Sequence, residues 1–237
     1  MNEILPGFWQ ISEANNFVNY YLWEWDGGVT LIDAGMPGDA SKIMEAVLKL
    51  GYAIHNVKRI YITHMDVDHA GSAAKLQQAT RAPVACHTVE KEFLEHPNRR
   101  RPAKLWVRPL AAVIMQLPKF RIQPLTPDEL LVDGQATPEG FTVIHTPGHT
   151  PGHISLLHKE KRLLITGDAL TNFKGKMGPP VALYTPDMPN AQRSIWKLAK
   201  KYGDDYDVIA FGHGPVILQN GGKRVTAYAS QVFSTKI

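Results

Sequence analysis

Residues 63–69 read Thr63-His64-Met65-Asp66-Val67-Asp68-His69 and directly follow the apolar run Ile60-Tyr61-Ile62. Four side chains of types that bind metal ions, His64, Asp66, Asp68 and His69, lie within six residues. A turn can aim such a cluster inward more readily than a continuous strand or helix can. The stretch therefore predicts a metal site at the end of a strand.

The same arrangement recurs downstream, where short apolar runs lead into Gly, Pro or Thr and then into His or Asp. The segments contain Thr146-Pro147-Gly148-His149-Thr150-Pro151-Gly152-His153, then Gly167-Asp168, then Gly212-His213-Gly214. Functional side chains gather on loops at strand ends, where the backbone turns sharply. Chance recurrence of this pattern in one chain is improbable, so we expect the segments to belong to one site.

In their order, these motifs resemble the signature of the metallo-β-lactamase superfamily: His-x-His-x-Asp-His, a Gly-His, a bridging Asp and a late His. The resemblance spans nearly the whole chain and implies an α/β fold, the αβ/βα sandwich of two mixed β-sheets flanked by helices. We expect a single domain of this kind over residues 1–237, with an inserted lid or interface segment at 97–124. Asp66 departs from the signature, because it stands where the family has its second His.

The resemblance also implies two divalent metal ions, with zinc expected first and iron or manganese as alternatives. Its metal ligands correspond here to His64, Asp66 and His149 for one ion, to Asp68, His69 and His213 for the other, and to Asp168 as the bridge. By the same resemblance, Asp33 and Thr63 would support the ligand loop without binding metal. His153, four residues after His149, is expected to support the loop or to pack at the start of the next strand. Asp68 and Asp168 are the expected catalytic residues.

The chemistry of such a centre needs no nucleophilic side chain. A bound cation lowers the pKa of water towards neutrality and polarises a carbonyl or phosphoryl oxygen. Asp66 changes this centre, because a carboxylate is shorter and harder than an imidazole. If Asp66 binds metal, it reduces the net positive charge of the site and favours iron or manganese.

The resemblance favours a hydrolase that opens a small ester, lactone or thioester with a metal-bound hydroxide, as in the lactonase and glyoxalase II-like branches. Many of those lactonases have a Tyr soon after the bridging Asp, where this chain has Thr171. We therefore add Thr171, Tyr184 and Trp106 as candidates for the substrate pocket. Two alternatives stay open: a mononuclear iron oxygenase resembling the persulfide dioxygenases, and a metal-binding protein with little turnover.

Composition sets the remaining expectations. The 237 residues are 44% hydrophobic and 20% charged, with a net charge of +4 and a single cysteine, Cys86. A lone cysteine suits a reducing compartment, and the first residues lack an export pattern, so we expect a cytoplasmic protein. We expect a small-molecule substrate, no nucleic-acid partner and no stable membrane insertion, and a homodimer stays open. The basic and apolar residues at 99–120 favour a lid or interface over a membrane contact.

Periodicity predicts the elements that carry these loops. Strands are expected at 8–11, 16–25, 29–32, 58–62 and 83–86, then four strands between 130 and 165, and a last strand at 207–211. Helices are expected at 39–50, 70–80, 89–95 and 190–202. Residues 26–28, Asp26-Gly27-Gly28, are expected to form a hairpin turn.

Overall fold

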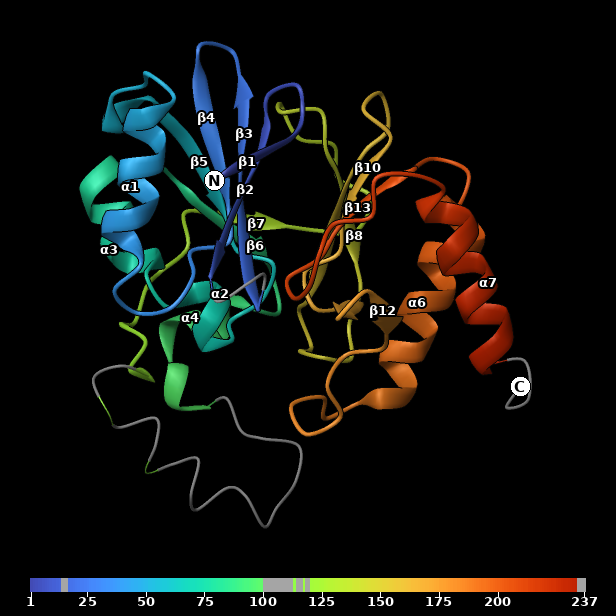
Figure 1. Ribbon diagram of the computed structural model, residues 1–237. Helices are drawn as coiled ribbons and strands as arrows, with labels where there is room; N and C mark the ends of the chain where they lie inside the picture. The colour runs from blue at the N-terminus through green and yellow to red at the C-terminus, as the bar shows by residue number, and fades with distance from the viewer. Residues whose placement is uncertain (14–16, 100–112, 114–116, 118–119, 234–237) are drawn as a thin grey trace. The chain divides into compact units, whose positions relative to one another are not determined.

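The computed structural model describes residues 1–13, 17–99, 113, 117 and 120–233. It divides into two compact units, Met1–Leu131 and Val132–Ile237, each with its own sheet and hydrophobic core (Figure 1). Most of the expected insertion at 97–124, including Trp106, lies outside the described residues. Its role as a lid or interface stays a prediction.

The first unit contains a seven-stranded mixed sheet whose strands follow chain order. The strands are β1 (Asn2–Leu5), β2 (Phe8–Glu13), β3 (Val18–Trp25), β4 (Gly28–Ile32), β5 (Val57–Tyr61), β6 (Val84–His87) and β7 (Glu129–Leu131). Neighbours from β1 to β4 run antiparallel, whereas those from β4 to β7 run parallel. The β3–β4 hairpin turns through Asp26 and Gly27, both at positive φ, the backbone that such tight turns require.

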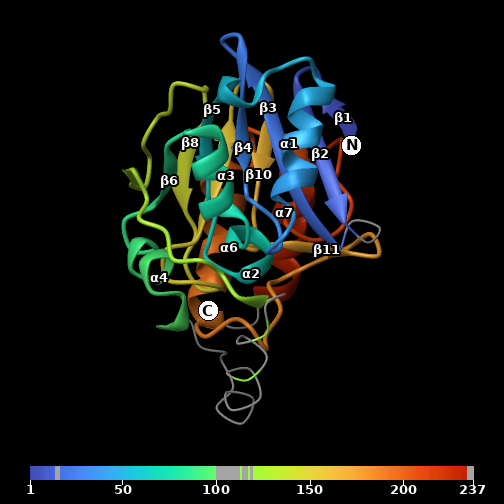
Figure 2. The same ribbon diagram turned by 90° about the vertical axis from the view of Figure 1, so that its left-hand side faces the viewer.

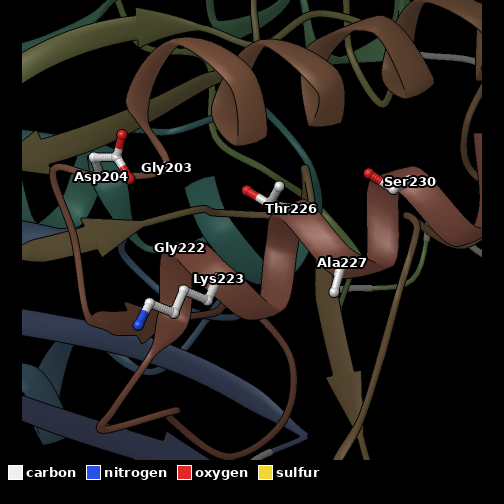
Figure 3. A pocket seen from close by; sticks show the side chains of 7 residues that line it. All are labelled: Gly203, Asp204, Gly222, Lys223, Thr226, Ala227 and Ser230. Atoms are coloured by element: carbon white, nitrogen blue, oxygen red, sulfur yellow. The ribbon is translucent and has the colours of Figure 1, made fainter.

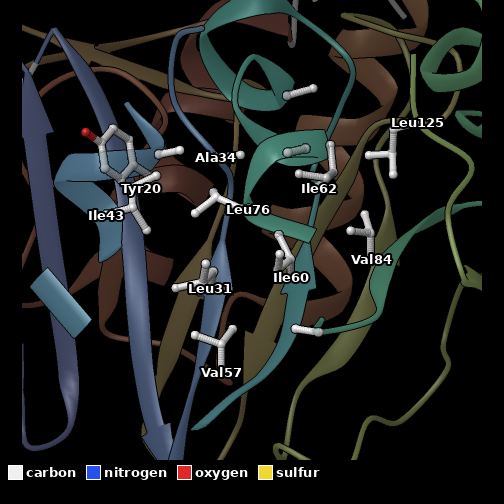
Figure 4. Close-up of a cluster of buried hydrophobic side chains, with 14 of the residues drawn as sticks. Tyr20, Leu31, Ala34, Ile43, Val57, Ile60, Ile62, Leu76, Val84 and Leu125 are labelled. Atoms are coloured by element: carbon white, nitrogen blue, oxygen red, sulfur yellow. The ribbon is translucent and has the colours of Figure 1, made fainter. Parts of the chain in front are cut away.

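Two amphipathic helices, α1 (Ala40–Lys49) and α3 (Ala73–Thr80), cover one face of this sheet (Figures 1 and 2). They bury Ile43 and Leu76 in a cluster with Leu31, Ile60 and other strand residues (Figure 4). Two shorter helices, α2 (Val67–Ala70) and α4 (Lys91–Glu95), follow β5 and β6. Short 3-10 turns occupy Ile54–Asn56 and Pro97–Arg99.

The second unit contains a four-stranded sheet in the order β13-β10-β9-β8. Its strands are β8 (Thr142–His145), β9 (Ile154–His158), β10 (Leu163–Ile165) and β13 (Val208–Ala210). A hairpin of β11 (Thr171–Phe173) and β12 (Lys176–Gly178) follows β10 in the chain. Helices α6 (Met188–Tyr202) and α7 (Gly221–Phe233) lie side by side and form a core with the sheet through Ile195, Leu198, Phe211 and Val225.

Helices α6 and α7 approach closely where α6 ends and α7 begins. A pocket there is lined by Gly203, Asp204, Gly222, Lys223 and neighbouring residues of α7 (Figure 3). A Cβ atom on Gly222 would lie 1.7 Å from the carbonyl oxygen of Gly203. Glycine at position 222 is therefore what allows the two helix ends to meet.

Three local predictions need correction. The helix expected at 70–80 is present as α3, which begins at Ala73, but a separate short helix, α2, precedes it, so Asp68 and His69 lie on a short helix and not in an open turn. The first of the four strands expected between 130 and 165 is β7, which belongs to the sheet of the first unit. Helix α7 and the β11–β12 hairpin occupy residues for which the sequence predicted no element.

Within the described part of the chain, no helix is long and apolar enough to cross a membrane.

Candidate metal centre

The predicted ligand loop of the first unit lies at one edge of its sheet. Strands β4, β5 and β6 are parallel, so their carboxyl ends share an edge. Asp33 follows β4, the segment 63–69 follows β5, and Glu90 follows β6. The carboxyl edge of parallel strands is where open α/β sheets place their ligands.

Asp33 connects the two ends of the ligand loop. Its Oδ1 accepts hydrogen bonds from the Thr63 backbone N–H at 2.8 Å and from the Thr63 hydroxyl at 3.0 Å. Its Oδ2 lies 2.8 Å from Nδ1 of His69. Asp33 itself has a φ of 62°, a strained left-handed backbone that the surrounding bonds must maintain. The structure thus brings Asp33 and Thr63 to the ligand loop, where the sequence analysis expected them.

The hydrogen bonds of His64 and His69 fix which ring nitrogen can bind a cation. The Thr63 hydroxyl donates to Asp33, so it accepts from Nδ1–H of His64, 3.0 Å away. Nδ1–H of His69 donates to the carboxylate of Asp33. In the neutral form of each ring the lone pair therefore belongs to Nε2, and both rings are fully buried. Metal-binding histidines commonly hold their second nitrogen in this way.

Asp66 and Asp68 lie within reach of the same imidazoles. Ligand atoms of Asp66 and of His69 both come within 4.8 Å of a ligand atom of His64. Oδ2 of Asp68 lies 4.0 Å from Nε2 of His69, and its side chain is 22% exposed. The departure from the family signature at position 66 therefore leaves a carboxylate, and not an empty position, beside His64.

Glu90 contacts this loop, and the sequence did not predict it. It is fully buried, and its Oε1 accepts the backbone N–H of Met65 at 2.8 Å. In the sequence it reads as an ordinary acidic residue at the start of a short helix. Only the pairing of β5 with β6 reveals that it lies beside the loop.

The second unit places three predicted ligands at one edge of its own sheet. β8 and β10 are both antiparallel to β9, and β10 is parallel to β13, so all three have their carboxyl ends on the same side. His149, Asp168 and His213 follow these strands in turn. Oδ2 of Asp168 lies 3.6 Å from Nε2 of His149 and 3.1 Å from Nε2 of His213. One carboxylate oxygen thus lies near both imidazoles.

Further contacts orient these two histidines. The Thr185 hydroxyl donates to the carbonyl of Val181, so at 3.2 Å it accepts from Nδ1–H of His149. This leaves the lone pair of His149 on Nε2, which is directed at Asp168. The ring of Phe173, on β11, stacks on His213 with centroids 5.8 Å apart. Thr185 and Phe173 were not predicted, and nothing in the local sequence marks either one.

The remaining candidates have contacts of their own. Both ring nitrogens of His153 are used in hydrogen bonds, one with Thr146 and one with the backbone N–H of Asp168, which agrees with the expected supporting role. Thr171 is buried and donates its hydroxyl to the carbonyl of Pro179. Tyr184 is half exposed. A role of either residue in a substrate pocket stays a prediction.

A family model decides the identity of the chain. The model described as the metallo-beta-lactamase superfamily matches residues 15–213, which include every predicted ligand. The chain belongs to the metallo-beta-lactamase superfamily. The resemblance noted in the sequence is thereby confirmed, and with it the fold class, two mixed sheets with flanking helices.

Relatives place the chain among metallo-hydrolases. It is 33% identical over 224 residues to the probable metallo-hydrolase YflN of Bacillus subtilis (strain 168), covering 86% of this chain and 82% of that protein. It is 27% identical to hydroxyacylglutathione hydrolase GloC of Haemophilus influenzae, covering 81% and 83%. It is 26% identical to an N-acyl homoserine lactonase of a Bacillus species, covering 81% and 79%. These relatives support a hydrolase.

Solved structures agree with this fold. The metallo-beta-lactamase family protein TTHA1429 of Thermus thermophilus superposes with a TM-score of 0.73 at 24% identity, covering 97% of this chain and 80% of that one. The protein TTHA1623, solved in a di-iron-bound form, superposes with a TM-score of 0.69 at 27% identity, covering 92% and 98%. The fold implies divalent metal binding, and imidazole Nε2 atoms beside carboxylates are suitable donors for such ions.

Proposed function

We propose that the chain is a metal-dependent hydrolase that opens a small ester, lactone or thioester. The proposed ligands are His64, Asp66, Asp68 and His69 of the first unit and His149, Asp168 and His213 of the second, which together would hold two divalent ions. The family match supports their joint use, because it extends over all seven positions. The hydroxyacylglutathione hydrolase and lactonase relatives support this substrate class.

One observation carries the proposal furthest. Oδ2 of Asp168 lies within 3.6 Å of Nε2 of His149 and within 3.1 Å of Nε2 of His213. A buried carboxylate with two imidazole nitrogens at these distances is a donor set that suits a divalent cation. Asp168 would therefore be the bridging ligand, and its negative charge would draw both ions together.

Bound ions would supply a hydroxide at neutral pH and would polarise the carbonyl of the substrate. The protein's own contribution is to hold its ligands in place and to accept the proton that the attacking water loses. We assign Asp68, a partly exposed carboxylate of the ligand loop, to orient the attacking water and to accept its proton. Asp33 and Glu90 hold the loop on which Asp68 lies, through Thr63, His69 and Met65.

Metal identity depends on Asp66. With Asp66 the proposed centre has three carboxylates, and oxygen donors favour harder ions than imidazole does. We keep zinc as the first expectation and iron or manganese as alternatives. The di-iron form of TTHA1623 shows that this fold accommodates iron in another protein.

The test is Asp168→Asn, which keeps the size of the side chain and removes its charge. Metal content is measured by elemental analysis after reconstitution with zinc, iron or manganese, and turnover is measured on a panel of lactones and thioesters. We expect the variant to lose at least one ion per chain and nearly all turnover. Asp133→Asn is the matched control, since Asp133 is a carboxylate of the same unit that pairs with Lys197.

The results separate this proposal from its alternatives. Unchanged metal content and turnover in Asp168→Asn would refute the assignment. One iron per chain with consumption of dioxygen in the presence of a persulfide would favour the oxygenase. Metal binding without turnover across the panel would favour a binding protein.

A further inference from the structure

His153 is a buried histidine that the proposed ligand set does not use. It lies directly before β9, at the same edge of the sheet as His149, Asp168 and His213, and it has no solvent exposure. Its second ring nitrogen, Nε2, accepts the backbone N–H of Asp168 at 2.9 Å. His153 therefore contacts the proposed bridging residue through the main chain and not through the carboxylate.

A chain of hydrogen bonds fixes the proton on the other nitrogen. The hydroxyl of Ser155 donates to the carbonyl of Thr166 at 3.1 Å, which uses its only hydrogen. Ser155 must then accept from the hydroxyl of Thr146, 3.1 Å away. With its own hydrogen used, Thr146 accepts from Nδ1 of His153 at 2.8 Å.

Both ends of this chain require the same tautomer. Thr146 requires a hydrogen on Nδ1 of His153, and the Asp168 N–H requires a lone pair on Nε2. Thr146, Ser155 and Thr166 are all buried, so water does not compete for these bonds. The first and last bonds of this network both reach the segment that follows β10. Thr166 accepts from Ser155 there, and Asp168, two residues later, donates to His153.

We infer that His153, held as its Nδ1–H tautomer by Thr146 and Ser155, is a positioning residue that fixes the backbone of Asp168 and so directs its carboxylate between His149 and His213. This inference rests on the proposed function for the role of Asp168. Gly167, which precedes Asp168, has a φ of 50°, so the turn depends on bonds such as this one to keep its direction. Loss of the acceptor would leave a buried N–H without a partner.

The first experiment reads the tautomer in the metal-free protein. Two-dimensional nuclear magnetic resonance that correlates ring nitrogens with ring carbon-bound protons distinguishes Nδ1–H from Nε2–H. We expect His153 to be the Nδ1–H tautomer in the wild-type protein. A ring protonated on Nε2 in the wild-type protein would overturn the inference. This outcome does not depend on metal binding, so it is separate from failure of the proposed function.

The second experiment tests the effect on the metal centre. His153→Leu removes both bonds, whereas His153→Gln places an amide oxygen near the former Nε2, where it can accept from Asp168. We expect His153→Leu to bind cobalt(II) about 10- to 100-fold more weakly and to change its visible absorption spectrum. His153→Gln should restore most of the affinity and the wild-type spectrum.

His158→Gln is the matched control, because His158 is a buried histidine at the far end of the same strand. It should leave the cobalt affinity and spectrum unchanged. A wild-type spectrum and affinity in His153→Leu would overturn the inference, as would a glutamine variant no better than the leucine variant. If His153→Leu fails to fold, Thr146→Val replaces it, since that change removes the hydroxyl and keeps the size of the side chain.

Discussion

Asp33 is the residue on which the ligand loop of the first unit depends. It accepts from Thr63 and His69 while its own backbone is held at a φ of 62°. Asparagine tolerates this backbone but lacks the charge that orients His69. We expect Asp33→Asn to weaken metal affinity about 10- to 100-fold, measured by competition with a chromophoric chelator. Asp26→Asn is the control, because Asp26 also has a positive φ, of 47°, and lies in a hairpin turn. Equal affinities in the two variants would contradict the assignment.

Asp66 tests how one residue tunes the choice of metal. Its carboxylate lies within 4.8 Å of a ligand atom of His64. Replacement of Asp66 would therefore change a candidate metal ligand itself and not a remote charge. We expect Asp66→His to raise the ratio of bound zinc to bound manganese when both are offered together, read by elemental analysis. Glu45→His, which adds a histidine at an exposed position of α1, controls for adventitious binding. No change in the ratio would place Asp66 outside the ligand set.

Cys86 is expected to be inert because it is buried beside acidic side chains. Burial, together with the charges of Glu90 and Glu95, raises the pKa of its thiol well above the usual range. The folded protein should therefore resist iodoacetamide at pH 8.5, whereas the unfolded chain should react, as read by mass spectrometry. Since the folded pKa is raised, the corresponding stability is present below about pH 8.5 and is lost as the pH rises above it. Rapid labelling of the native protein would contradict this burial.

Residue patterns predicted the candidate ligands but not the side chains that hold them. His64, Asp168 and His213 stand out because each follows an apolar run and a turn signal. Glu90 and Thr185 carry no such signal, since their roles arise from contacts with residues 25 and 36 positions away. Long-range partners of this kind are invisible to local sequence reasoning.

At the scale of elements, strands with a clear hydrophobic pattern were predicted within a few residues. Helix α7 was not, because it begins with Gly221-Gly222, which reads as a loop. Its glycine start follows from tertiary packing, since Gly222 meets the end of α6 at Gly203. The placement of β7 in the first sheet was likewise hidden, because strand order depends on pairing and not on local pattern.

The α6–α7 contact gives a prediction for stability (Figure 3). A methyl group at position 222 would overlap the carbonyl of Gly203, so we expect Gly222→Ala to destabilise the protein by about 1–3 kcal/mol. Gly178→Ala is the control, because its added Cβ would lie 3.7 Å from the nearest atom, an ordinary contact. Urea unfolding measures both free energies. If Gly222→Ala lowers the free energy of unfolding no more than the control does, close packing of the two helices at this position is contradicted.

At the scale of the whole molecule, each compact unit carries part of the proposed ligand set on the loops at one edge of its sheet. Four ligands follow β5 in the first unit, and three follow β8, β10 and β13 in the second. If all seven act together, removal of a ligand from either unit should have the same effect on metal binding. Bound metal should also stabilise the folded chain, because only the native state brings the ligands together to bind it.

The measurement that tests this account most directly is the metal-to-chain ratio of the reconstituted protein, alongside His64→Asn and His213→Asn. We expect about two ions per wild-type chain, and a loss of at least one ion in each variant, although the two histidines lie in different units. His55→Asn, a change outside the ligand set, should retain the wild-type ratio. A wild-type chain that binds no zinc, iron or manganese, or variants that keep the full ratio, would contradict the central claim.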